Sequence, residues 1–168
     1  MNDNFDLTTA TSATEQPPIV DAITADTTTV DTTEENTPAL ATLPKNYLVG
    51  GYHATTDKGA KYLRPEFVDE YARNIAASLN EMKPAEFAAM LRDLKRAKKS
   101  TLPFEARKTA AAELLPRAIG LVHKKKAPSI LTEFIKTNLT AIKTDDDWSA
   151  FYRHMNAING FLMAGGDA

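Results

Sequence analysis

The sequence predicts an all-α protein, a compact bundle of about five helices, and three observations lead to this fold class. Between residues 65 and 163 the apolar residues recur at helical spacing. Proline and glycine interrupt the pattern at positions that suit helix ends. No segment shows a convincing alternation of apolar and polar residues, so no β-strand is predicted.

The chain changes composition at about Pro44, and the two parts differ in charge. Residues 1–44 contain eight acidic residues, twelve threonines, one aromatic residue and no lysine or arginine. This segment has too little apolar surface to offset the entropy of ordering it, so we predict an acidic, threonine-rich disordered tail. Residues 45–168 hold all 20 cationic residues and the remaining 14 of the 22 acidic ones, a net charge of +6. They are long enough for one domain.

Proline positions and apolar stripes predict the first two helices. Pro65 stands at a first-turn position, and the stripe after it predicts a helix that ends near Met82. Lys83-Pro84 opens the second helix, which runs to Lys98-Lys99-Ser100 before Pro103 breaks the pattern. The predicted buried residues are Phe67, Tyr71, Ile75 and Leu79 in the first helix and Phe87, Met90, Leu91 and Leu94 in the second.

Three further helices are predicted in the same way. The third begins near Phe104 and contains Pro116, where we expect a kink or a restart. Ala127-Pro128 opens the fourth, and Gly165-Gly166 ends the fifth. Asp145-Asp146-Asp147 is expected to cap the start of the fifth helix, where backbone N–H groups are free. The predicted buried residues are Ile130, Leu131, Phe134, Ile135, Leu139 and Ile142 in the fourth helix and Trp148, Phe151, Met155, Ile158 and Leu162 in the fifth.

The segment MLRDLKRAKKS, residues 90–100, concentrates five cations around one acid, Asp93. At about 100° per residue, four of these cations share one helix face, away from the apolar stripe. A solubilising face usually mixes charge signs, whereas Asp93 is the only acid between Glu86 and Glu105. We interpret this face as a surface for the phosphates of a nucleic acid, which reward several cations by releasing counterions. The four candidates are Arg92, Lys95, Arg96 and Lys99.

Cations later in the sequence add candidates. Arg107 and Lys108 are assigned to phosphate binding, on the expectation that the fold brings them near the first four. Lys124, Lys125 and Lys126 have two explanations that the sequence leaves open. They contact RNA, or they interact with the exposed carbonyls at the end of a helix.

The aromatic residues bear on the mode of binding, because unpaired bases commonly stack on exposed rings. Most of these residues fall at core spacing, which leaves Tyr47, Tyr52 and Tyr62 outside the stripes, with Tyr152 as a further candidate. Few rings are therefore free for bases. We expect contacts to the nucleic-acid backbone rather than sequence readout.

The sequence shows no pattern typical of an enzyme, a metal centre or a membrane protein. It has no cysteine, which excludes disulfides and thiolate metal sites and fits a reducing cytoplasm. His53, His123 and His154 are not spaced as metal ligands. The chain contains no phosphate-cradling glycine motif, no secretory leader and no membrane-spanning stretch. We expect a cytoplasmic, non-catalytic protein without a metal or a cofactor.

The order of features from residue 49 to 163 is similar to that of a known family. The stretch GYHATTDKGAKYLRPEFVDEYARNIAASL combines a Gly-Tyr turn, a Leu-Arg-Pro-Glu helix start and an alanine-rich amphipathic helix. A basic second helix follows, and WSAFYRHMNAINGFL is a last helix with an aromatic start. This succession resembles the small helical subunit of type III-A CRISPR effector complexes, the Csm complex. In the second helix Ala88 stands where the family often has arginine, and Arg92 lies one turn later.

The resemblance implies a non-catalytic subunit, present in several copies and stacked along the guide and target RNA beside the backbone subunits. Sequence recognition would come from base pairing, so the subunit would need only a positive surface. Its partners would be guide RNA, target RNA, other subunits of the effector complex and copies of itself. Two alternatives remain open. The chain is a helical protein–protein adaptor without RNA contact, or a small acid–base nuclease that uses His123 or His154.

Overall fold

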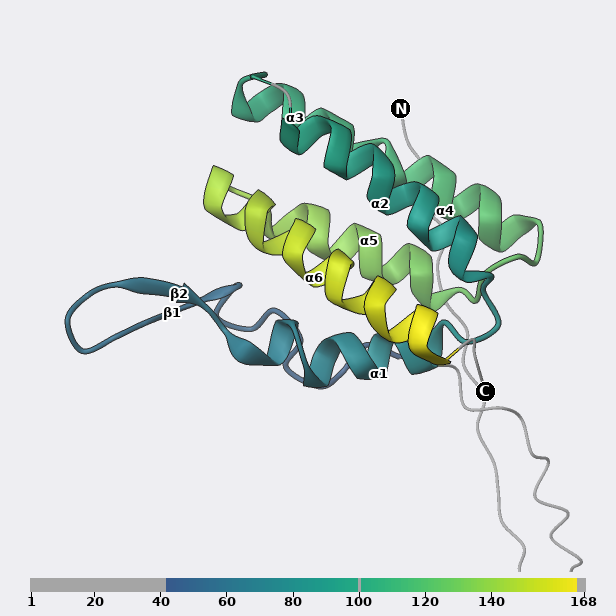
Figure 1. The fold of residues 1–168 in the computed structure, drawn as a ribbon, viewed down its shortest axis with the longest axis horizontal. Helices are drawn as coiled ribbons and strands as arrows, with labels where there is room; N and C mark the ends of the chain where they lie inside the picture. Colours follow the sequence, from purple (N-terminus) through teal and green to yellow (C-terminus); the bar gives the residue numbers. More distant parts are fainter. Residues whose placement is uncertain (1–41, 100, 166–168) are drawn as a thin grey trace, which may run out of the picture. The chain divides into compact units, whose positions relative to one another are not determined.

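The computed structural model describes residues 42–99 and 101–165, which belong to one compact unit. Of the predicted disordered tail, residues 1–41 lie outside the described residues. In the described part the chain forms six α-helices, one short 3-10 helix and a two-stranded hairpin (Figure 1), so the all-α prediction is confirmed. The elements are β1 (His53–Thr55), β2 (Lys61–Leu63), η1 (Pro65–Phe67), α1 (Glu70–Ser78), α2 (Pro84–Lys99), α3 (Phe104–Ala112), α4 (Leu114–His123), α5 (Ile130–Ala141) and α6 (Asp145–Gly165).

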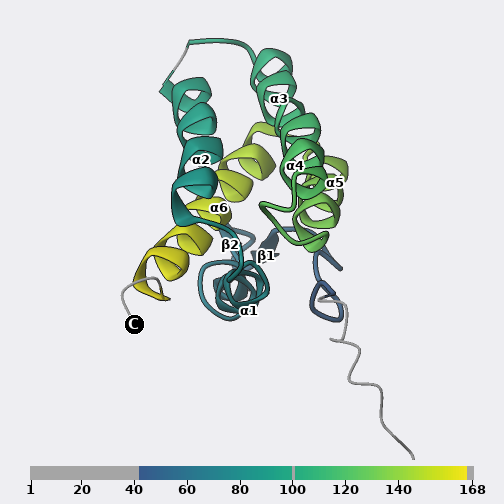
Figure 2. The same cartoon turned by 90° about the vertical axis from the view of Figure 1, so that its right-hand side faces the viewer.

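Helix α6 is the central element of the bundle. It packs mainly against α1 and α2 and also contacts α3, whereas α4 packs against α5. Figure 2 shows α6 passing between α1 on one side and α2 and α3 on the other. Every predicted buried residue of the first, second, fourth and fifth helices is buried except Leu139, which is half-buried. In the apolar stripe predicted for the third helix, Ala111, Leu114 and Leu121 are buried and Ala110, Leu115 and Val122 are half-buried. None of the helices in the described residues is long and apolar enough to span a bilayer.

Two of the predicted helices are divided. The first begins with the 3-10 turn η1, and α1 follows it from Glu70. The third is divided at Glu113, where α3 ends and α4 begins, three residues before the proline that predicted an interruption. Pro116 is thus the third residue of α4. A proline is tolerated there because the first-turn N–H groups of a helix have no partner within the helix.

A small hairpin precedes η1, and its strands were not predicted. Strands β1 and β2 are antiparallel, with His53 opposite Leu63. The tip is closed by the Gly59 N–H, which donates to the Thr56 carbonyl at 2.8 Å. Gly59 has φ +80°, a conformation that glycine adopts without steric cost. Strands of three residues are too short to show an alternating pattern, which explains the wrong prediction.

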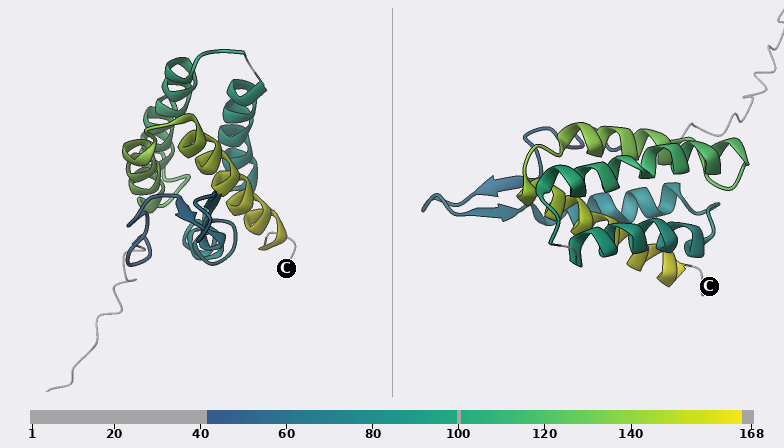
Figure 3. Two further views of the ribbon diagram at one scale, coloured as in Figure 1. Left: turned by 90° about the vertical axis from the view of Figure 1, so that its left-hand side faces the viewer. Right: turned by 90° about the horizontal axis from the view of Figure 1, so that it is seen from above.

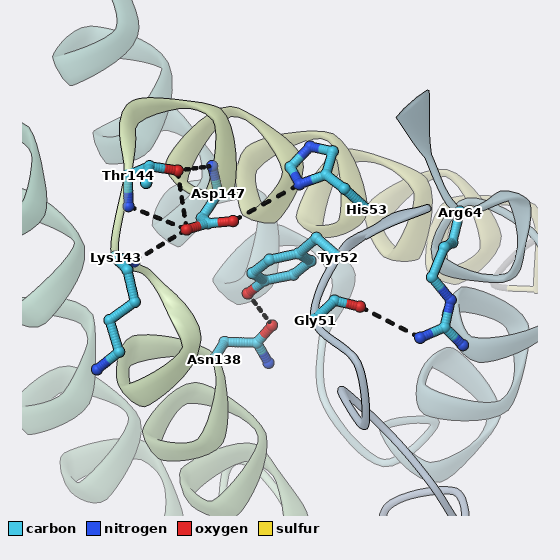
Figure 4. Close-up of polar contacts among 8 residues, drawn as sticks. All are labelled: Gly51, Tyr52, His53, Arg64, Asn138, Lys143, Thr144 and Asp147. Carbon is cyan, nitrogen blue, oxygen red and sulfur yellow. Dashed lines mark hydrogen bonds and ion pairs between the residues drawn. The ribbon is translucent and has the colours of Figure 1, made fainter. Parts of the chain in front are cut away.

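The segment before the hairpin is part of the core, although its tyrosines were predicted to lie outside it. Tyr47 and Tyr52 are 8% and 1% exposed, so the prediction that they are available for bases is wrong. Both hydroxyls donate to Asn138 Oδ1, at 3.1 and 2.7 Å, and Asn138 Nδ2 donates to the Phe134 carbonyl at 2.7 Å. Burial raises the pKa of both tyrosines, so their hydroxyls stay neutral donors. Figure 4 shows Tyr52 directed at Asn138.

The start of α6 carries a capping box, which confirms the predicted role of the aspartates for one of the three. The Asp147 carboxylate accepts hydrogen bonds from the Thr144 N–H and hydroxyl, both at 2.9 Å. In return Thr144 Oγ1 accepts from the Asp147 N–H at 3.2 Å. These reciprocal bonds, seen in Figure 4, satisfy backbone groups that the helix leaves free. Asp145 forms an ion pair with Arg107 instead, at 2.6 Å.

Candidate nucleic-acid interface

Helix α2 separates its cations from its apolar residues, as the sequence predicts. Phe87, Met90, Leu91, Leu94 and Ala97 are buried. Four cations are exposed on the opposite side of the helix: Arg92, Lys95, Arg96 and Lys99. We call these four residues the basic face. The bundle therefore uses one side of α2 for packing and leaves the basic face available to a partner.

Asp93 neutralises part of this charge. Its two carboxylate oxygens lie 3.2 Å from Arg96 Nη2 and 2.6 Å from Arg117 Nη1, and the second contact joins α2 to α4. Arg92, Lys95 and Lys99 form no ion pair within the described residues. Three of the four cations of the basic face therefore remain uncompensated by a neighbouring carboxylate.

Arg107 and Lys108 on α3 lie in different environments. The Arg107 guanidinium is 2.6 Å from Asp145 Oδ1 and lies over the Trp148 ring, with its side chain only 19% exposed. The Arg107 carbonyl also accepts a hydrogen bond from Trp148 Nε1 at 2.9 Å. Arg107 therefore holds α3 against α6, and its charge is already paired. Lys108 lies over the Phe104 ring of its own helix, 5.9 Å from the centroid, and has no ion pair in the described chain.

Lys124, Lys125 and Lys126 are exposed at the end of α4. Lys126 Nζ lies 3.4 Å from Glu86 Oε1, which places this lysine beside the first turn of α2. At a rise of about 1.5 Å per residue, the first turn of α2 and Lys99 are roughly 20 Å apart along the helix. The lysines at the end of α4 therefore lie near the start of α2, and Lys99 of the basic face lies at its end. Cations at both ends of α2 would suit an extended polymer.

The end of α4 also explains part of this lysine run by local structure. The Lys125 N–H donates to the Val122 carbonyl and the Lys126 N–H to the Leu121 carbonyl, both at 2.9 Å. This is a Schellman motif, whose left-handed position is usually glycine. Here Lys125 occupies it with φ +53°. A lysine in this position is strained, because its Cβ approaches the following carbonyl oxygen.

Replacing Lys125 with glycine is expected to raise the free energy of unfolding by about 0.5 to 1 kcal/mol, because glycine removes the strain of the left-handed conformation. Urea denaturation of the full chain would measure the change. Lys124→Gly is the matched control, since Lys124 has φ −80° and glycine relieves no strain there. A Lys125→Gly variant that is less stable than the parent would contradict this account of the α4 end.

The three histidines have separate roles. His154 is buried, and its Nδ1 is hydrogen-bonded to the Phe67 carbonyl. Its imidazole therefore has no access to a substrate in this structure. His53 Nδ1 lies 3.6 Å from Asp147 Oδ1, and His123 is exposed at the end of α4. Across residues 42–99 and 101–165, no three histidine or acidic side chains gather closely enough to hold a metal ion.

Two tyrosines remain at or near the surface. Tyr62 on β2 is 45% exposed. Tyr152 on α6 stacks on Trp148, with ring centroids 6.1 Å apart, and Lys98 Nζ lies 4.4 Å from the centre of the Tyr152 ring. Tyr152 is therefore covered by a tryptophan and a lysine. Tyr62 is the better placed of the two for a base.

The nine sequence-predicted candidates divide into two groups. Arg96, Arg107 and Lys126 form ion pairs with carboxylates of the bundle. The other six form none within the part of the chain that the structure describes; they are Arg92, Lys95, Lys99, Lys108, Lys124 and Lys125.

In comparisons with protein-family models, curated proteins and solved structures, nothing matches this chain.

Proposed function

We propose that this protein is the non-catalytic small subunit of a type III-A CRISPR effector complex and acts in the cytoplasm. Several copies would line the guide and target RNA, pack against the backbone subunits, and hold RNA phosphates through the basic face of α2. Because base pairing would select the target, the protein would need no sequence readout of its own. No cofactor enters this proposal.

One observation carries the proposal. Arg92, Lys95 and Lys99 are exposed on one side of a helix whose other side is core, and none of them is paired with a carboxylate in the described chain. Cations that serve only solubility are normally interspersed with acids. A phosphate backbone would supply the missing negative charges and release counterions on binding. The helical fold and the order of the sequence features agree with the family resemblance.

The double substitution Arg92→Glu/Lys95→Glu is expected to weaken binding of the isolated protein to RNA by at least about tenfold at low salt. It should also reduce the slope of log affinity against log salt concentration by about one to two units. Each phosphate contact that is lost lowers the number of counterions released on binding. Fluorescence anisotropy with a labelled RNA, repeated over a salt series, measures both quantities.

Lys136→Glu/Lys143→Glu is the matched control. It makes the same change in net charge at exposed lysines of α5 and of the loop after it. Equal losses in the two double variants would mean that only net charge matters, and unchanged binding in both would remove the proposed role of the basic face. Denaturation curves that coincide with the parent would show that neither variant is unfolded.

Purification of the tagged protein from its host tests the assembly. A ladder of effector subunits together with a short guide RNA is the expected result. Ultraviolet crosslinking within that assembly separates the proposal from the adaptor alternative. Crosslinks from this chain to RNA support the proposal, whereas crosslinks to protein subunits alone would make it an adaptor.

A further inference from the structure

A second cationic site lies away from the basic face, in a cleft of about 420 Å³ between the hairpin and the first turns of α6. Strand β2 contributes Lys61 and Leu63 to its walls, and α6 contributes Asp146, Ser149 and Arg153. Volumes of this size are typical of sites for small organic groups. Neither Lys61 nor Arg153 belongs to the basic clusters predicted from the sequence.

The two cations of this cleft, Lys61 and Arg153, have no ion-pair partner among the residues that the structure describes. Seven arginines occur in the sequence, and all lie in the described residues. Five of them form ion pairs: Arg64, Arg73, Arg96, Arg107 and Arg117. Only Arg92 and Arg153 form none in this part of the chain, and Arg92 belongs to the basic face. Arg153 and Lys61 are both exposed and form no ion pair with any described residue, although they line one cleft.

The walls of the cleft are fixed by contacts at the base of the hairpin. Arg64 Nη1 donates to the carbonyls of Val49 and Gly51 at 2.7 and 3.2 Å. His53 Nδ1 lies 3.6 Å from Asp147 Oδ1, which holds β1 beside the first turn of α6. Figure 4 shows the Arg64–Gly51 and His53–Asp147 contacts around the buried Tyr52. The base of the hairpin thus lies beside the first turn of α6, where His53 and Asp147 face each other.

The cleft lies at the same end of the bundle as the end of α2, which carries the last residue of the basic face. Lys98, next to Lys99 at the end of α2, lies over the ring of Tyr152, the residue before Arg153. Figures 1 and 3 show the hairpin, the start of α6 and the end of α2 at the same end of the bundle. A polyanion that followed the basic face to the end of α2 would thus arrive at the end of the bundle that carries the cleft.

Asp146, the acid in the cleft, favours a ribose phosphate over a free phosphate ion as the ligand. Lys61 and Arg153 supply two positive charges, and Asp146 supplies one negative charge. A carboxylate repels a phosphate but accepts a hydrogen bond from a hydroxyl group. The ribose of RNA carries such a hydroxyl next to each phosphate, and this 2′-hydroxyl distinguishes RNA from DNA. Two cations beside one acceptor therefore match a ribose phosphate better than a free phosphate ion.

We propose that the cleft between the hairpin and α6 binds one nucleotide unit of an RNA strand. Lys61 and Arg153 hold its phosphodiester, and Asp146 accepts a hydrogen bond from its 2′-hydroxyl. The proposal takes its partner class from the proposed RNA-binding function but rests on a separate set of residues. It extends the phosphate-binding surface from α2 across the end of the bundle to the hairpin.

The test uses the full chain and a labelled oligouridylate in fluorescence anisotropy at low salt. Lys61→Ala/Arg153→Ala is expected to weaken binding by about tenfold, as expected for the loss of two charged contacts. Lys58→Ala/Lys136→Ala removes the same charge at exposed lysines of the hairpin tip and α5, and should leave the affinity nearly unchanged. Equal weakening in both double variants, or no binding of the oligouridylate by the parent, would overturn the proposal.

Two competition arms identify the chemistry of the ligand. Inorganic phosphate at the concentration of the oligonucleotide should not displace it; displacement would mean that the cleft takes a free phosphate and would overturn the proposal. An oligodeoxyuridylate of the same length should bind more weakly than the RNA, and Asp146→Ala, which removes the acceptor, should reduce this difference. An unchanged preference in Asp146→Ala would remove the hydroxyl contact from the proposal.

These assays test the two proposed RNA sites, the basic face and the cleft, independently of each other. If Arg92→Glu/Lys95→Glu binds oligouridylate as well as the parent while Lys61→Ala/Arg153→Ala does not, the cleft stands and the role of the basic face fails. The reverse result overturns the cleft and leaves the proposed function intact. Denaturation midpoints equal to that of the parent exclude unfolding as the cause of either loss.

Discussion

Replacing Phe134 with alanine is expected to lower the free energy of unfolding by about 3 to 5 kcal/mol. Phe134 is fully buried on α5, and its ring lies 5.6 Å from the His154 ring and 6.3 Å from the Tyr47 and Phe151 rings. Truncation removes apolar contacts with two separate parts of the chain, the segment before the hairpin and α6, and leaves a cavity among rigid rings that have little freedom to fill it. Urea denaturation followed by circular dichroism would measure the loss.

Phe104→Ala is the matched control for this substitution. Phe104 begins α3, is half-buried, and contacts Lys108 of its own helix. The same chemical change there should cost much less, because solvent already reaches the ring. If the two variants lost similar stability, or if Phe134→Ala cost less than about 1 kcal/mol, the burial of Phe134 among the Tyr47, Phe151 and His154 rings would be incorrect.

Acidification should destabilise the bundle through His154, by up to about 3 kcal/mol between pH 7 and pH 4. Burial lowers the pKa of His154 from its ordinary value of 6.5 to about 4, because the charged imidazolium is poorly solvated among the surrounding rings. Those rings belong to Tyr47, Phe67 and Phe134. Nδ1 is bonded to the Phe67 carbonyl, but the buried Nε2 has no partner in the structure to accept a second proton.

The direction of this effect follows from the two pKa values. Between pH 6.5 and about 4 the unfolded chain binds a proton at His154 that the folded chain does not. The stability contributed by the neutral imidazole is therefore fully present above pH 6.5 and is lost as the pH falls toward 4. Denaturation curves over a pH series measure this loss.

His154→Gln provides the comparison, since glutamine keeps an N–H donor for the Phe67 carbonyl but does not titrate. The variant should be less stable than the parent at neutral pH, and the difference between the two should shrink as the pH falls. A difference that stays constant from pH 7 to pH 4 would show that His154 does not titrate in this range.

Sequence patterns predicted the helical part of the fold because its determinants are local. The stripe around Phe134 and the aspartates before Trp148 predict a buried face and a helix start from neighbouring residues alone. The break at Glu113 was predicted three residues late, because a proline limits where a helix can begin without fixing the position of its first residue.

The burial of Tyr47 and Tyr52 could not be predicted in this way. Their partner Asn138 lies 91 and 86 residues further along the chain, and the short segment between them shows no periodic pattern. A tyrosine can be an exposed platform or a buried hydrogen-bond donor, and only the tertiary partner decides between the two. The two hairpin strands were missed because of their length.

For the candidate interface too, the sequence predicts the local features but not the contacts between helices. Helical spacing is enough to place Arg92 and Lys95 on one face. The carboxylates that neutralise Arg107 and Arg117 come from α6 and α2, so these ion pairs depend on how the helices pack. The cleft was missed for the same reason. Lys61 and Arg153 are distant in sequence, and neither belongs to a run of like charges.

The anchoring of Tyr47 and Tyr52 on Asn138 has a consequence for dissecting the chain. A fragment that started at α1 would retain all six helices, but it would expose the amide of Asn138 and remove three buried aromatic rings from the core, those of Tyr47, Tyr52 and Phe67. Autonomous folding therefore requires the stretch upstream of the first helix. The minimal unit that can be expressed alone begins before Tyr47, well ahead of the boundary that helix positions would suggest.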